Sequence, residues 1–213
     1  MNPHVPATTP IATPYFIESF RRAPDTRHLD PVLMEQWRLR LLRTQMLWNV
    51  STTCSTLFAA IRFGAAELRS PITKIVGIGL GRLDAEPAFY QSALQHMAVF
   101  SIASTLHTFN TSRTNNAVAG MEIVLQGPCY TPLDHTLLSS LTPHRITFLS
   151  DPEALLAIDA STLLVSAYLP ISVPLMQIVA YLSSEPREKG TGMMLWDRVI
   201  GMRKSKRWYC MRN

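Results

Sequence analysis

After the first thirty residues, hydrophobic side chains recur at steps of three and four, which is the spacing of one face of an α-helix. Asp30 followed by Pro31 is typical of a helix N-cap with proline at the first helical position. A second stretch with the same period begins after Ser51. Together the two stretches predict a helical hairpin over residues 31–69.

The first thirty residues have no such period. Residues 1–30 contain five prolines and no continuous apolar run, so they do not form the apolar region of a signal peptide. A mitochondrial transit sequence fits less well, because no arginine precedes Arg21. We therefore expect a disordered leader.

From residue 70 the pattern changes to short apolar runs that alternate with longer amphipathic stretches. The first run, at 72–78, is rich in β-branched residues and leads through a glycine turn into a long apolar helix at about 85–108. Further strands are predicted at 121–126, 145–149, 162–167 and 193–196, the last at the sheet edge. Further helices are predicted at 131–141, 151–156 and 173–182, and a surface loop at 110–120. The alternation predicts an α/β domain over 70–200, an open, mainly parallel Rossmann-like sheet of about five strands with helices on both faces.

One stretch is long enough to imitate a membrane span. Residues 162–182 contain no charged side chain, and a helix of this length would cross a bilayer. Pro170 and Pro174 lie in its middle, however, and each removes a backbone donor. A buried strand, a loop and a helix account for the run better than a transmembrane segment does.

Composition places the chain among globular proteins. Of its 213 residues 47% are hydrophobic and 16% charged, a balance that excludes a wholly disordered chain. The net charge of +5 comes from the end of the chain, where six of the twenty basic residues lie within the last sixteen. We expect residues 201–213 to form a solvated basic tail, and nucleic acid would bind only through its cluster of Arg203, Lys204, Lys206 and Arg207.

The residue types that carry common catalytic chemistry are scattered. Three cysteines and six histidines show no metal-ligand spacing, and the few cysteines fit a reducing compartment, the cytoplasm or the nucleus. No G-x-S-x-G elbow occurs, and Ser166 lies inside an apolar strand. The sequence therefore assigns no catalytic residue and no metal ligand, and it defines no cofactor.

The glycine turn is the clearest candidate for a ligand site. Gly77, Gly79 and Gly81 follow one another where a doubly wound sheet carries its phosphate-binding turn. The third glycine of the dinucleotide fingerprint is absent, since Arg82 and Asp84 occupy its two alternative positions. Two interpretations stay open, a tight turn that needs glycine only for its backbone and a ligand site.

A ligand at this turn would also meet side chains that follow the second strand of the domain. The ligand-binding candidates are Gly77, Gly79, Gly81, Arg82, Gln126, Tyr130 and Asp134. On this interpretation the chain is a nucleotide- or S-adenosylmethionine-dependent small-molecule transferase with its cleft at Gly79-Leu80-Gly81.

The order of these motifs resembles the Sensitivity-To-Red-Light-Reduced-like (SRR-like) domain, in particular its fungal branch. The resemblance is carried by the glycine turn, by Gln126-Gly127-Pro128-Cys129-Tyr130 with Asp134, and by Ile158-Asp159 before the strand at 162–167. It covers roughly residues 70–183. The resemblance implies an intracellular regulatory protein with a protein partner, because members are linked to circadian or light signalling and to haem-related regulation. It does not imply an enzyme.

Two positions depart from the family pattern. Gly127 replaces an acid that usually follows Gln126, and the segment Pro170-Ile171-Ser172 lacks the His and Cys found there in many members. Any acid-base or metal-binding role of those groups is therefore in doubt for this chain.

Overall fold

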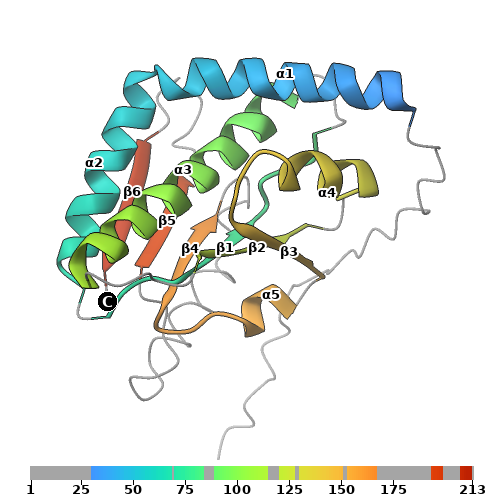
Figure 1. The fold of residues 1–213 in the computed structure, drawn as a ribbon. Helices are drawn as coiled ribbons and strands as arrows, with labels where there is room; N and C mark the ends of the chain where they lie inside the picture. Colours follow the sequence, from blue (N-terminus) through green and yellow to red (C-terminus); the bar gives the residue numbers. More distant parts are fainter. Residues whose placement is uncertain are drawn as a thin grey trace, which may run out of the picture.

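The structure, a computed structural model, describes residues 30–68, 70–83, 89–114, 120–127, 130–150, 153–166, 193–198 and 207–212. Six strands form one sheet in the order β3-β2-β1-β4-β5-β6 (Figure 1). They are β1 (Lys74–Ile78), β2 (Glu122–Gln126), β3 (Arg145–Leu149), β4 (Thr162–Ser166), β5 (Met193–Arg198) and β6 (Arg207–Arg212). The first five are parallel to one another, and β6 pairs antiparallel with β5.

The central strand β1 lies between β2 and β4. The parallel register places Ile78 opposite both Gln126 and Ser166, so the three strands end at the same level. Their carboxyl ends therefore form one edge, at the point where the strand order reverses. In open α/β sheets this is where ligands bind when there are any.

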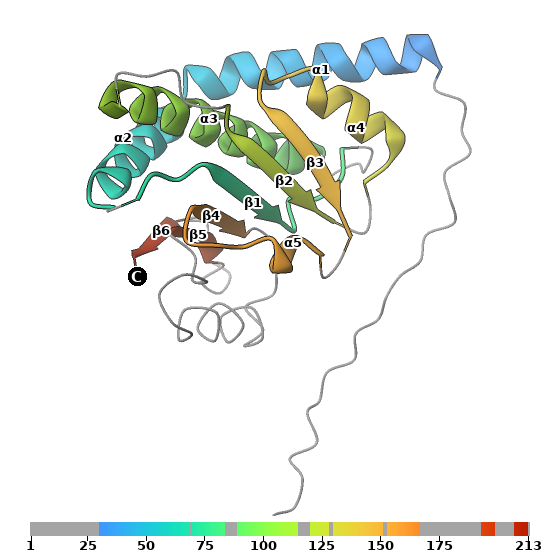
Figure 2. The same ribbon diagram turned by 60° about the horizontal axis from the view of Figure 1, so that its bottom comes forward.

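Among the described residues, four helices cover one face of the sheet and a fifth, short helix lies on the other (Figure 2). The four are α1 (Pro31–Asn49), α2 (Thr52–Ala66), α3 (Phe89–Thr114) and α4 (Pro132–Ser139), and the fifth is α5 (Glu153–Leu156). The first two helices begin at side-chain caps, and the cap at Asp30 was predicted. The Asp30 carboxylate accepts the N–H of Val32 at 2.9 Å, and the Ser51 hydroxyl accepts that of Cys54 at 3.1 Å.

The main core lies between the sheet and α3, which is buried along most of its length. Inward residues of the sheet, such as Ile75, Leu125 and Leu163, are fully buried there. The helical hairpin α1–α2 shares this core, because Trp48 is buried in it and its indole N–H donates to the Ser101 hydroxyl of α3 at 2.8 Å. The opposite face has a smaller core around Val76, Val124 and Leu164 of the sheet, with Ala154 and Ile158.

The predicted fold class is confirmed, and the structure differs from the prediction at two places. The sheet has six strands and not about five, because residues 207–212, predicted as part of a basic tail, form β6. The strand β5 is consequently not at the edge. The helix α3 also continues to Thr114, into the predicted loop at 110–120, since the buried Asn110 amide donates to the Ile72 carbonyl at 2.7 Å.

Several predicted segments lie outside the described residues. These are the leader up to residue 29, the helix at 173–182 and the basic residues Arg203, Lys204 and Lys206. Of the uncharged run at 162–182, the described part is the strand β4. None of the helices in the described ranges combines the length and the apolar character needed to cross a membrane.

Candidate functional site

The glycine turn leaves the carboxyl end of β1 and has the backbone that its sequence predicts. Gly79 and Gly81 have φ angles of 72° and 77°, in the left-handed region that favours glycine. Gly81 also approaches α3 closely, because a Cβ atom added there would overlap the Ser92 hydroxyl oxygen. The Gly79 N–H donates to the carbonyl of Gln126 at 3.4 Å and so links the turn to β2.

Asp134 holds the far end of the turn. Its side chain is fully buried, and one carboxylate oxygen accepts the backbone N–H of Leu83 at 3.2 Å. The other oxygen accepts the backbone N–H of Thr131 at 2.7 Å and its hydroxyl at 2.8 Å. The Asp134 N–H in turn donates to the Thr131 hydroxyl at 3.3 Å, which completes a capping box at the start of α4. Asp134 therefore joins the turn after β1 to the first turn of α4.

Tyr130 forms a buried pair with His96 of α3. The Tyr130 hydroxyl lies 2.8 Å from Nε2 of His96, and Nδ1 of His96 lies 2.7 Å from the Ser92 carbonyl oxygen. A carbonyl only accepts, so Nδ1 carries the proton and Nε2 accepts the tyrosine O–H. Burial lowers the pKa of His96 to about 4, partly offset by the bond to Ser92, and the imidazole is neutral at pH 7.

The tyrosine is neutral as well, because burial and the nearby Asp134 carboxylate raise the pKa of Tyr130 above its usual range. Its ring packs edge-on against Phe148 at a centroid distance of 5.3 Å. The same ring fills the space beside Gly127, where an added Cβ would lie 3.1 Å from it. Gly127, which replaces the acid of the family pattern, thus lies in close contact with the Tyr130 ring.

The remaining predicted residues do not all lie on the same face of the sheet. Gly77 lies inside β1, and an added Cβ there would lie 2.9 Å from Leu80 and 3.0 Å from Leu125. Gln126, at the end of β2, has the same strand parity as Val124, so its buried side chain belongs to the face opposite that of Leu125. Tyr130, by contrast, packs against the main core.

The predicted site is therefore gathered at one edge but not in one pocket. The turn with its two glycine conformations, Asp134 and Tyr130 lie on the main-core side. Gln126 lies on the other face, and Arg82 is partly exposed within the turn. Ligand binding at this edge stays a prediction.

Sequence reasoning missed Ser92, His96 and Thr131. Thr131 had a recognisable signal, since Thr-x-x-Asp before an apolar stretch is the pattern of a capping box. His96 had a weaker one, because it lies at helical spacing from the buried Ala93 and Phe100. Nothing in the sequence points to Ser92 as the neighbour of Gly81.

The amino end of the sheet holds a separate ionic cluster. Nζ of Lys74 donates to the Asp159 carboxylate at 2.8 Å and to the Ala157 carbonyl at 3.0 Å. Asp159 also accepts the Ser161 and Thr162 hydroxyls at 2.7 and 2.9 Å. Burial alone would raise the pKa of Asp159, but these bonds outweigh it and hold the pKa at about 2. Across the described ranges, no three His, Cys, Asp or Glu side chains are grouped to hold a metal ion.

Comparison with known proteins adds one match. The family model described as the SRR1 domain matches residues 33–207, which include nearly all of the helical hairpin and the strands β1 to β5. No curated protein and no solved structure matches the chain.

Proposed function

This chain belongs to the SRR1 domain family, and we propose that it is a regulatory protein of the cell interior that acts by binding a partner protein and not by catalysis. The family match spans most of the chain, and the resemblance of its motifs implies regulation.

The observation that carries the proposal is that both oxygens of the Asp134 carboxylate already accept hydrogen bonds from the protein itself. This group is the one acid among the predicted site residues, and it is buried with both oxygens bonded to the backbone and hydroxyl of its neighbours. A general acid or base has to reach a substrate proton. Asp134 instead stabilises the turn. His96 is also fully buried, and its Nε2 is hydrogen-bonded to the Tyr130 hydroxyl.

A second candidate is a nucleotide- or S-adenosylmethionine-dependent transferase. One observation favours it, the position of the positive-φ turn at Gly79 and Gly81 where the strand order reverses. Backbone N–H groups in such a turn can approach an anionic ligand closely.

Thermal unfolding of the full chain with ATP, NAD, S-adenosylmethionine and haem separates the two candidates. A ligand at about a hundred times its Kd would stabilise the fold by about 2.7 kcal/mol, which for a chain of this size raises Tm by roughly 5–10 °C. We expect none of the four to raise Tm. A saturable rise with ATP, NAD or S-adenosylmethionine would favour the transferase, and a rise with haem would show a ligand-responsive regulator.

A further inference from the structure

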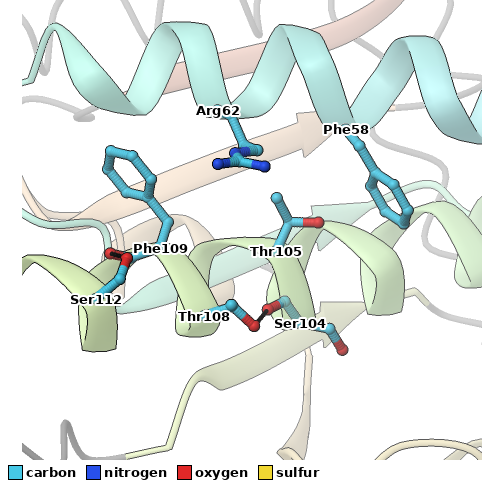
Figure 3. A pocket seen from close by; sticks show the side chains of 7 residues that line it. All are labelled: Phe58, Arg62, Ser104, Thr105, Thr108, Phe109 and Ser112. Atoms are coloured by element: carbon cyan, nitrogen blue, oxygen red, sulfur yellow. Dashed lines mark hydrogen bonds between the residues drawn. The ribbon is translucent and has the colours of Figure 1, made fainter.

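A groove of about 320 Å³ lies between α2 and α3, away from the glycine turn. Two aromatic rings, Phe58 and Phe109, stand at its ends, and Figure 3 shows the Arg62 guanidinium between them, directed toward α3. The α3 wall presents hydroxyl groups, among them those of Thr105, Thr108 and Ser112. The volume is at the lower end of the roughly 300–1,000 Å³ of ligand pockets, and it fits one or two side chains better than a large cofactor.

The groove is positively charged. The sequences of α2 and α3 contain no Asp or Glu, and their arginines are Arg62 and Arg113. The Arg113 guanidinium lies 5.6 Å from the centroid of the Phe109 ring. Within the described part of the chain, the guanidinium of Arg62 takes part in no hydrogen bond or ion pair. No acidic side chain in the described ranges pairs with Arg62, which leaves its charge available to an acid of a bound partner.

The hydroxyl groups of the wall are available as acceptors. Their protons are donated within α3, from Thr105 to the Ser101 carbonyl at 2.8 Å and from Thr108 to the Ser104 carbonyl at 2.9 Å. Ser112 likewise donates to the Phe109 carbonyl at 2.8 Å. Each oxygen keeps lone pairs for a donor from outside. A bound molecule that supplies both N–H donors and a carboxylate would match the groove.

We propose that this groove binds an acidic segment of a partner protein, an inference that rests on the proposed function. A carboxylate of the segment pairs with Arg62, its backbone N–H groups donate to the α3 hydroxyls, and an adjacent apolar side chain packs between Phe58 and Phe109. Phe63, which follows Arg62 and is 65% exposed, extends the apolar surface beyond the groove. A DNA backbone matches less well, because its phosphates would pair with Arg62 but its sugars and phosphates offer no donors to the hydroxyls.

The test is selection of a displayed library of random twelve-residue peptides on the immobilised full chain, followed by fluorescence anisotropy with the selected peptides. The variant Arg62→Glu reverses the charge in the groove, and Arg62→Gln removes it. Arg43→Glu is the matched control, because Arg43 is also an exposed helical arginine and lies outside the groove. We expect the wild type and Arg43→Glu to select peptides in which Asp or Glu adjoins Phe, Leu or Met. We expect Arg62→Glu to weaken their binding at least tenfold and Arg62→Gln to weaken it less.

If peptides of this kind bind Arg62→Glu with unchanged affinity, the groove is not their binding site, and the proposed function still stands. Selection of basic peptides would also contradict the proposal that the groove binds an acidic segment. Failure to enrich any peptide would count against both proposals. Binding of single-stranded polyuridylate or of phosphatidylserine vesicles that Arg62→Glu abolishes, with no peptide response, would assign the groove to nucleic acid or to lipid instead.

Discussion

The carboxylate of Asp134 accepts the backbone N–H of Leu83 at 3.2 Å, although 51 residues separate the two along the chain. This contact connects the end of the glycine turn after β1 to the first turn of α4. It explains why an acid is needed at position 134 without any ligand, because Leu83 would otherwise leave a donor without this partner. The one acid among the predicted site residues is thus a residue that shapes the turn.

Substitution of Gly81 by alanine is expected to destabilise the fold by about 1–3 kcal/mol. The φ of 77° strains any L side chain, and the new Cβ would overlap the Ser92 hydroxyl oxygen. Urea unfolding measures the change in free energy. The double variant Gly81→Ala with Ser92→Ala should recover part of the loss, since it removes the overlapping oxygen but leaves the backbone strain.

Gly120→Ala is the matched control for this experiment. A Cβ at Gly120 meets no atom within 4 Å, and its φ is not in the left-handed region. Its free energy of unfolding should stay within about 0.5 kcal/mol of the wild type. Equal effects at the two glycines would contradict the close approach of the turn to α3.

The buried His96 predicts a loss of stability in mild acid. Its pKa is lowered by burial to about 4 in the folded chain, against 6.5 for an exposed histidine. Between these two pH values the unfolded chain binds a proton that the folded chain does not, so the free energy of unfolding falls as pH drops from 6.5 to 4. The expected contribution is about 3 kcal/mol.

His96→Gln tests this assignment, because glutamine does not titrate. The variant should be less stable than the wild type at pH 7, and its free energy of unfolding should vary less between pH 6.5 and 4. An unchanged pH profile in the variant would show that another group titrates in this range.

The Lys74–Asp159 pair predicts a second, more acidic pH dependence. The folded pKa of Asp159 is about 2, below its value of 3.8 when exposed, so its stabilisation is present above pH 4 and is lost as pH falls from 4 to 2. Because 43% of the carboxyl side chain is exposed, water screens the pair, and we expect about 1 kcal/mol. Asp159→Asn should lose this amount at pH 7 and much less at pH 2, as measured by urea unfolding at both values.

Much of the fold was predictable because its signals are local. The run of β-branched residues before Gly79 predicted β1, and Asp30 with Pro31 predicted the start of α1. The strand β6 was missed because the basic cluster that ends at Arg207 indicated a solvated tail. Trp208 and Tyr209, which favour strands, were the contrary signal.

The candidate site was predictable in its location and not in its contacts. The sequence placed Gly79, Gly81 and Gln126 at one edge, as the structure does. It did not indicate that the Gln126 side chain and the Tyr130 ring lie on opposite faces of the sheet. The face of each side chain depends on how β2 and the loop after it pack on the two cores. The bond from Leu83 to Asp134 and the pairing of His96 with Tyr130 are long-range contacts without a local pattern.

The most direct measurement is the free energy of unfolding of Asp134→Asn in urea at pH 7. Its matched control is Asp30→Asn, because asparagine caps an exposed helix start as well as aspartate does. An amide at position 134 loses charge-assisted bonds to three buried donors, and we expect a loss of about 3 kcal/mol. The control should change by less than about 0.5 kcal/mol. If Asp134→Asn is as stable as the control, Asp134 does not brace the turn, and the proposal that this edge serves the fold and not a reaction is contradicted.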